Sequence, residues 1–126
     1  MFKPIVIIIL LANSLFVATA DAGNPAARIG DSMNSGGVIL PPGAPTVMIG
    51  GKPAARLGDQ TSDPRVFPPP NIFSPPIICT GGPIINGSAT VLIGGLPAAR
   101  LGDLASSGPC PPHTIIQGAP TVLIGG

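Results

Sequence analysis

The side chains in this sequence that could do chemistry are few, and they include one histidine and two cysteines. His113 follows Cys110 by three residues, a short spacing at which two side chains can chelate one metal ion, and Cys79 lies in an earlier segment. The cysteines could instead form a disulfide in an oxidising compartment or remain free thiols. Because the sequence has no glutamate and a single histidine, an acid–base pair or an activated nucleophile is poorly supplied. We therefore expect no enzymatic activity.

A second polar pattern is an arginine followed three residues later by an aspartate. It occurs three times, as Arg28 and Asp31, Arg56 and Asp59, and Arg100 and Asp103. The forked donors of arginine bind carboxylates and turn carbonyls readily. Three equivalent pairs do not make one asymmetric site with a separate acid and base. We interpret them as structural ion pairs.

The composition describes a chain that buries a core. Hydrophobic residues make up 44% of the sequence and charged residues only 9%, with a net charge of +1. The 18 glycines and 18 prolines are numerous enough for a low-complexity chain. However, disorder is associated with low hydrophobicity and high charge, which this chain lacks. Without a basic patch, nucleic acid is not an expected partner.

Two phrases alternate along the chain, and each occurs three times. The phrase Pro-Ala-Ala-Arg-Ile/Leu-Gly-Asp occupies residues 25–31, 53–59 and 97–103. A second phrase, built around Thr-Val-Met/Leu-Ile-Gly-Gly, occupies residues 43–51, 87–95 and 118–126. The segments between the phrases vary in length. This pattern indicates three copies of one supersecondary unit, with insertions confined to one end.

The local chemistry of the phrases predicts β-hairpins. The run Thr-Val-Leu-Ile is β-branched and aliphatic, the following Gly-Gly allows a chain reversal, and Pro-Ala-Ala-Arg restarts as an extended strand. Further short strands are expected at 37–40, 83–86 and 114–117. A single hairpin is not stable alone, whereas three can bury their apolar faces along a common axis. We therefore predict a small all-β domain of three β-hairpin repeats at residues 23–126.

Residues 1–22 form a hydrophobic leader. Lys3 precedes an uncharged run from Pro4 to Ala20, and small residues near position 20 offer a cleavage site, as in a signal peptide. An uncleaved anchor is the second interpretation, because the run is at the short limit for a membrane-spanning helix. The leader leaves a periplasmic or membrane location open.

The two phrases together resemble those of PAAR-repeat proteins over residues 24–126. The resemblance implies a conical, pseudo-threefold β domain that caps a trimeric β-helical spike, either a VgrG-like protein of a type VI secretion system or the spike of a contractile phage tail. It also implies one chain per spike trimer, delivery out of the cell or into a target, and contact with the target-cell membrane on puncture. No small-molecule substrate is implied. A buried or misannotated leader is the third interpretation. Effector-linked members often carry hydrophobic N-terminal helices, so the resemblance adds translocated cargo as a further interpretation of the leader.

The resemblance assigns the second phrase to the face that docks on the spike. A pseudo-threefold chain can satisfy three identical spike subunits only if its contact surface repeats. The expected spike-binding or structural positions are Thr46, Val47, Ile49, Thr90, Val91, Ile93, Thr121, Val122 and Ile124. The variable loops, including the proline-rich segment 63–76, would then gather at the tip.

The resemblance further implies a zinc ion near the apex, held by histidine and cysteine side chains. The candidate ligands in this sequence are Cys79, Cys110, His113 and Asp63. Two positions where a ligand is expected carry Ser35 and Ser107, which are poor zinc ligands. A disulfide between the cysteines stays open as an alternative. The alternative function is an exported or membrane-anchored small β-repeat protein stabilised by that disulfide or by a metal.

Overall fold

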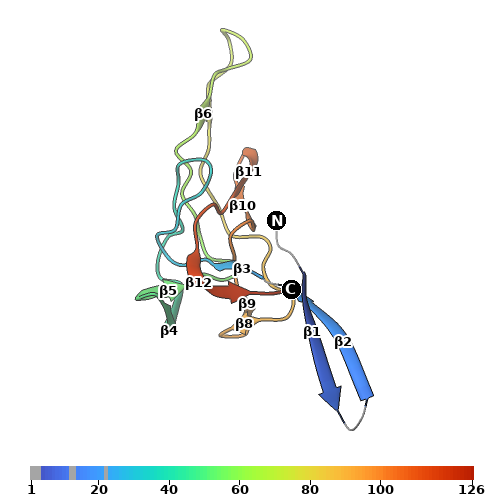
Figure 1. Ribbon diagram of the computed structural model, residues 1–126. Coiled ribbons are helices and arrows are strands. Elements are labelled where there is room, and N and C mark those ends of the chain that lie inside the picture. The colour runs from blue at the N-terminus through green and yellow to red at the C-terminus, as the bar shows by residue number, and fades with distance from the viewer. Residues whose placement is uncertain (1–3, 12–13, 22) are drawn as a thin grey trace.

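The chain is an all-β protein. The computed structural model describes residues 4–11, 14–21 and 23–126, and every regular element within these ranges is a β-strand (Figure 1). Over the described ranges, the strands pair into six two-stranded antiparallel sheets. A helix able to cross a membrane is not found in this part of the chain. The predicted all-β fold of hairpin repeats is confirmed.

The strands are short, and their bounds follow the repeats. They are β1 (Pro4–Leu11), β2 (Ser14–Asp21), β3 (Asn24–Ala26), β4 (Ala44–Ile49), β5 (Lys52–Ala54), β6 (Val66–Phe67), β7 (Ile77–Ile78), β8 (Leu92–Ile93), β9 (Leu96–Pro97), β10 (Leu104–Ser107), β11 (Cys110–Thr114) and β12 (Ala119–Ile124). Strands β1 and β2 pair with each other within the leader. The expected cleavage or anchoring of the leader rests partly on residues 1–3, 12–13 and 22, which lie outside the described ranges, and stays a prediction.

Three equivalent strand pairs come from the two repeated phrases. The pairs β4–β5 and β8–β9 are hairpins. In the first, the chain reverses at Gly50 and Gly51 with φ of 59° and 81°, values that favour glycine. The third pair is different, because β12 pairs with β3 and so joins opposite ends of the described domain. The third strand pair is therefore completed by β3, which includes the start of the first Pro-Ala-Ala-Arg phrase.

A ring of backbone hydrogen bonds links the three repeats around a central axis. The amide of Ala27 donates to the carbonyl of Ala99, the amide of Ala99 to that of Ala55, and the amide of Ala55 to that of Ala27, at 2.9, 3.0 and 3.0 Å. All three side chains are buried. Because the backbones approach one another so closely, a side chain larger than a methyl group has no room at these positions.

The core is two thin layers on either side of this ring. One layer contains Ile49, Ile93 and Ile124 packed with alanines from the three strand pairs, and the other contains Ile39, Ile84 and Ile115 with Met33 and further alanines. Each isoleucine comes from the same position of a different repeat. The segments expected as strands at 37–40 and 83–86 form isolated β-bridges, such as Ser32 with Val38 and Ile84 with Ala105.

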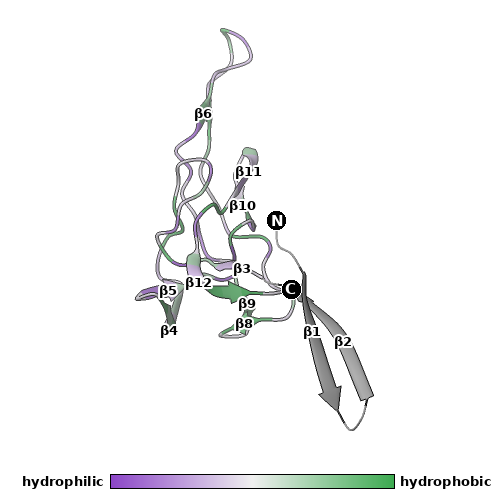
Figure 2. Cartoon of the chain, in the orientation of Figure 1, coloured by the Kyte–Doolittle hydropathy of each residue, from purple (hydrophilic) through white to green (hydrophobic). Residues whose placement is uncertain are grey.

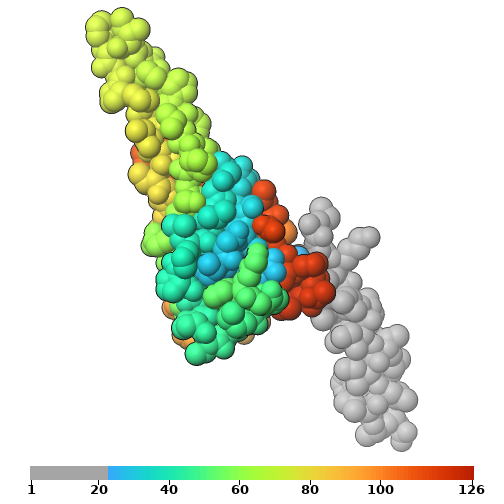
Figure 3. All heavy atoms as spheres, turned by 90° about the vertical axis from the view of Figure 1, so that its left-hand side faces the viewer, coloured from blue at the N-terminus to red at the C-terminus, as the bar shows by residue number. Residues whose placement is uncertain are grey.

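The domain is cone-shaped, with unlike ends (Figures 1 and 3). The wide end carries β4, β5, β8 and β9. The opposite end narrows and continues into a thin projection that contains β6 and β7, which we call the arm (residues 66–78). The arm coincides with most of the proline-rich insertion, so the longest insertion of the chain lies opposite the wide end.

Candidate functional site

The wide end presents a large apolar side chain at the same position of each of its three strand pairs. Met48, Leu92 and Leu123 occupy equivalent places beside the buried isoleucines, and they are 56%, 59% and 52% exposed. Figure 2 shows the apolar character of this end along β8 and β12. We call these three residues the apolar triad. Three large hydrophobic side chains repeated by the symmetry of the fold indicate an interaction surface.

The nine positions expected to dock divide between this surface and the core. Ile49, Ile93 and Ile124 are buried in the core layer of the wide end. The exposed positions are Thr46, Thr90, Thr121, Val91 and Val122, and Val47 is half-buried. The apolar triad itself is not among the positions predicted to dock. The signal was present in the Met or Leu before each isoleucine, because neighbouring strand residues face opposite sides.

The three arginine–aspartate pairs fasten each turn that follows the alanine ring. In each pair, a carboxylate oxygen of the aspartate accepts a hydrogen bond from the backbone amide of the arginine, at 2.7 to 2.8 Å. The side chains pair at 3.1 Å for Arg28 with Asp31 and 3.3 Å for Arg100 with Asp103. The third pair, Arg56 with Asp59, is looser at 3.9 Å.

Two of these arginines also reach the strand pairs of the wide end. Arg56 Nη2 donates to the carbonyl of Gly43 at 3.2 Å, and Arg100 Nη1 donates to the carbonyl of Gly125 at 3.2 Å. These bonds connect the turns to the segments that flank the exposed apolar triad. The arrangement is structural, because each carboxylate accepts a hydrogen bond from the backbone amide of its own arginine and pairs with that arginine's side chain, loosely in the case of Arg56.

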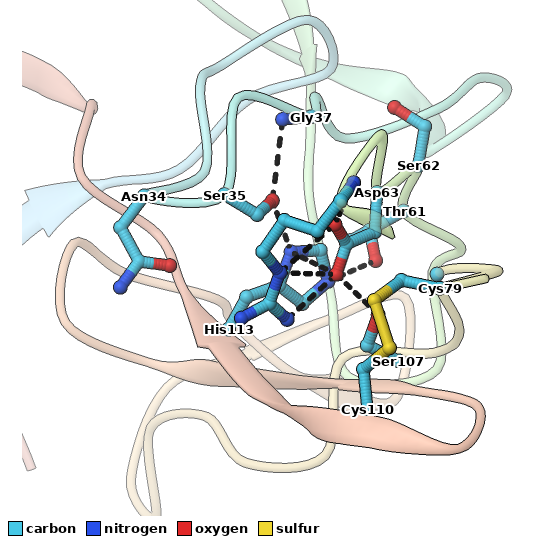
Figure 4. Close-up of polar contacts among 12 residues, drawn as sticks. Asn34, Ser35, Gly37, Thr61, Ser62, Asp63, Cys79, Ser107, Cys110 and His113 are labelled. Carbon is cyan, nitrogen blue, oxygen red and sulfur yellow. Dashed lines mark hydrogen bonds and ion pairs between the residues drawn. A yellow bond between two sulfur atoms is a disulfide. The ribbon is translucent and has the colours of Figure 1, made fainter. Parts of the chain in front are cut away.

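At the narrow end, His113 occupies the centre of a buried polar cluster (Figure 4). Its Nδ1 lies 2.7 Å from the hydroxyl of Ser35, and its Nε2 lies 2.9 Å from the hydroxyl of Thr61. The Thr61 hydroxyl donates its only hydrogen to the carbonyl of Gly82 at 2.7 Å. Thr61 must therefore accept a hydrogen bond from Nε2–H, which leaves Nδ1 to accept one from Ser35. The network is complete with a neutral imidazole.

His113 breaks the threefold symmetry of the cone. Equivalent backbone bonds place it at the position that Gly37 and Gly82 occupy in the other two repeats. At Gly37, a Cβ atom would lie 1.7 Å from the carbonyl oxygen of Ser62, so only glycine fits there. Only the third repeat thus has a side chain at this position, and its imidazole fills the space at the apex.

Beside the histidine, Asp63 is held by Arg65 at the base of the arm. Arg65 Nη2 and Nε donate to Oδ2 of the carboxylate at 2.7 and 3.0 Å, and its backbone amide donates to Oδ1 at 2.9 Å. The hydroxyl of Ser107 also donates to Oδ2. These hydrogen bonds, with that of the Arg65 side chain foremost, hold the pKa of Asp63 well below its usual range. Arg65 Nη2 also donates to the carbonyl of Pro111 at 2.8 Å, which ties the arm to β11.

A disulfide between Cys79 and Cys110 also fastens the arm to the body (Figure 4). Cys79 directly follows β7, the second strand of the arm, and Cys110 begins β11. The two residues are 31 positions apart. In the chain-entropy account, closing a loop of that length stabilises the fold by about 3 to 4 kcal/mol. Residues 63–65 on one side and Cys79 on the other therefore clamp both strands of the arm to the body.

The candidate zinc ligands are brought together, but in this state they do not fit a zinc ion. The sulfur atoms of Cys79 and Cys110 are bonded to each other, both imidazole nitrogens of His113 lie within hydrogen-bonding distance of hydroxyls, and Asp63 is saturated by Arg65 and Ser107. Across the residues that the structure covers, no cluster of three potential ligands has metal-binding geometry. Zinc binding by the chain with reduced cysteines stays a prediction.

Comparison with known proteins identifies one family. The family model for the PAAR motif matches twice, at residues 29–75 and 76–126, so it covers most of the chain. No curated protein matches the sequence. The boundary between the two matched segments lies within the arm. Strand β3, which completes the third strand pair, precedes both segments.

The apex cluster predicts acid sensitivity. Burial lowers the pKa of His113, although Asp63, 3.8 Å from Nδ1, opposes the shift, and Arg65 adds to it. Because the folded pKa lies below the unfolded one, the neutral imidazole stabilises the fold above about pH 6.5, and this contribution is lost as the pH falls. We predict a lower free energy of unfolding at pH 5 than at pH 7 in urea titrations.

The variant His113→Gln is the matched control, since its amide can still bind a hydroxyl but does not titrate. His113 is the only histidine and the chain has no glutamate, so the difference between pH 7 and pH 5 should largely disappear in the variant. A pH dependence that is unchanged in His113→Gln would show that another group is responsible.

Proposed function

The chain belongs to the PAAR-motif family, the spike-tip structural proteins of secretion and phage systems, and we propose that it caps and sharpens a trimeric β-helical spike. The spike is VgrG-like or that of a contractile phage tail. One chain sits on one trimer, and the machine's contraction drives the tip through a target-cell membrane. The chain is a non-enzymatic structural part in this proposal.

The observation that carries the proposal is the apolar triad at the wide end. A spike trimer ends in three identical subunits, and a single chain can contact them equally only if it repeats its own surface about the same axis. Met48, Leu92 and Leu123 come from equivalent positions and are all more than half exposed. Covering them removes the exposed half of each side chain from water. Each therefore contributes roughly half of the 1.5 to 3 kcal/mol that burying a fully exposed side chain of this size provides.

The strand pairs of the wide end supply a second reason for docking. Within the described domain each pair is a separate two-stranded sheet, linked to its neighbours by isolated bridges such as Arg28 with Ala54, and its remaining strand edges make no further ladder. The end of a β-helix has open edges as well. Unpaired edges seek pairing or cover, and a cap that brings three edges to three others satisfies both partners.

A second candidate function is supported by the disulfide. Disulfides persist in oxidising compartments, and the leader resembles an export signal. In this alternative the chain is an exported or membrane-anchored β-repeat protein. The mass of the protein isolated from its own cells separates the two functions. A mature start near Asp21 or Gly23 favours export, whereas an intact leader on a chain found with its spike favours the tip function.

The tip function predicts a complex of one chain with three spike subunits in native mass spectrometry. Replacing Leu92 with Asp should weaken binding more than tenfold, because a charge would be buried against the spike. The triple change Met48→Asp, Leu92→Asp and Leu123→Asp should abolish binding while the thermal unfolding midpoint stays near that of the parent. Ser74→Asp, in the arm, is the control and should bind normally.

Ile93→Asp completes the design, because Ile93 is buried and its replacement should unfold the domain rather than weaken docking alone. A complex of three chains with three subunits, or normal binding by the triple variant, would contradict the proposed docking face.

A further inference from the structure

The far end of the arm exposes the two most solvent-accessible large hydrophobic side chains of the described domain. Ile72 is 89% exposed and Phe73 is 90% exposed. They lie between two proline clusters, Pro68–Pro70 and Pro75–Pro76. In Figure 3, the arm is a thin column that stands clear of the body. Isolated, nearly complete exposure of two neighbouring apolar residues at the end of a projection is unfavourable in water unless another surface covers them.

The tip holds these side chains in a defined turn. The side-chain oxygen of Asn71 accepts hydrogen bonds from the backbone amide of Phe73 at 2.9 Å and from the hydroxyl of Ser74 at 3.2 Å. The amide of Ser74 donates to the carbonyl of Asn71 at 3.2 Å. A turn held by hydrogen bonds to Asn71 thus exposes Ile72 and Phe73 side by side. The contacts of Arg65 and Cys79 fix the base of the arm to the body.

The arm has no charged side chain and few free backbone N–H groups. Residues 66–99 contain no acidic, basic or histidine side chain. Five of the nine residues from 68 to 76 are prolines, which have no amide hydrogen, and two of the remaining amides are bonded within the turn. Unpaired backbone N–H and C=O groups both oppose transfer into hydrocarbon. The scarcity of free N–H groups lowers this cost, and the carbonyls stay hydrated when the tip inserts only as far as the interfacial region.

From these features we propose that Ile72 and Phe73 insert into the interfacial region of a lipid bilayer. A bilayer accepts a narrow convex tip without a matching pocket, which a protein partner would need. Because the arm is uncharged, insertion does not depend on anionic headgroups, and neutral phosphatidylcholine suffices. The inference rests on the proposed function and deepens it. It names Ile72 and Phe73 as the residues that first contact the target membrane when the wide end is docked on the spike.

The absence of tryptophan from the sequence allows a direct test with the full-length protein. In Phe73→Trp, the only indole lies at the tip. With phosphatidylcholine vesicles, its emission should shift to shorter wavelength and be quenched by lipids brominated on the acyl chain. Ile116→Trp, an exposed body position outside the arm, is the matched probe and should show neither effect. Raising the salt concentration should not reverse the shift.

Binding is measured by co-flotation with the same vesicles. Replacing Ile72 or Phe73 with Ser should lower the partition coefficient about tenfold each, and Ile116→Ser should leave it unchanged. The proposal is overturned if the emission of Phe73→Trp does not change, if the indoles of Phe73→Trp and Ile116→Trp are quenched equally, or if the double variant Ile72→Ser and Phe73→Ser floats as well as the parent. No spike is present, so the outcome is independent of whether the wide end docks as proposed.

Discussion

The rest of the structure depends on the three amide-to-carbonyl hydrogen bonds that join Ala27, Ala55 and Ala99 in a closed ring. Three backbones can meet at one axis only where the side chains are as small as a methyl group, which explains why the Ala-Ala of the first phrase is kept in every copy. The ring fixes the repeats at equivalent positions around the axis. The ion-paired turns and the apolar triad therefore also lie at equivalent positions around the axis.

The two ends of the cone use this framework in opposite ways. At the wide end the symmetry is preserved, and three equivalent side chains face outward together. At the narrow end it is broken, because a single imidazole, one buried carboxylate and one disulfide come from different repeats. The asymmetry allows one insertion to extend into an arm that is clamped on both strands. A symmetric base and a single projecting tip are the two features on which the proposed capping and piercing role rests.

The repeats made most of the fold predictable from the sequence. The long-range strand pairing and the oxidation state of the cysteines could not be predicted. The hairpins could be read from Thr-Val-Leu-Ile, Gly-Gly and Pro-Ala-Ala, because each turn is local. The pairing of β12 with β3 joins opposite ends of the domain and leaves no local signal. Whether Cys79 and Cys110 bind metal or each other depends on redox conditions as well as spacing. The contribution of Arg65 to the apex was missed because it lies outside both repeated phrases.

Native-state hydrogen exchange at the three ring amides tests the central claim most directly. If the closed ring is the element on which the fold depends, the amides of Ala27, Ala55 and Ala99 should exchange only through global unfolding. All three should then have the same exchange free energy, equal to the free energy of unfolding measured in denaturant. Rapid exchange at Ala27 with continued protection at Ala55 would show that the ring opens at its junction with the first strand. That result would contradict a single cooperative pseudo-threefold unit.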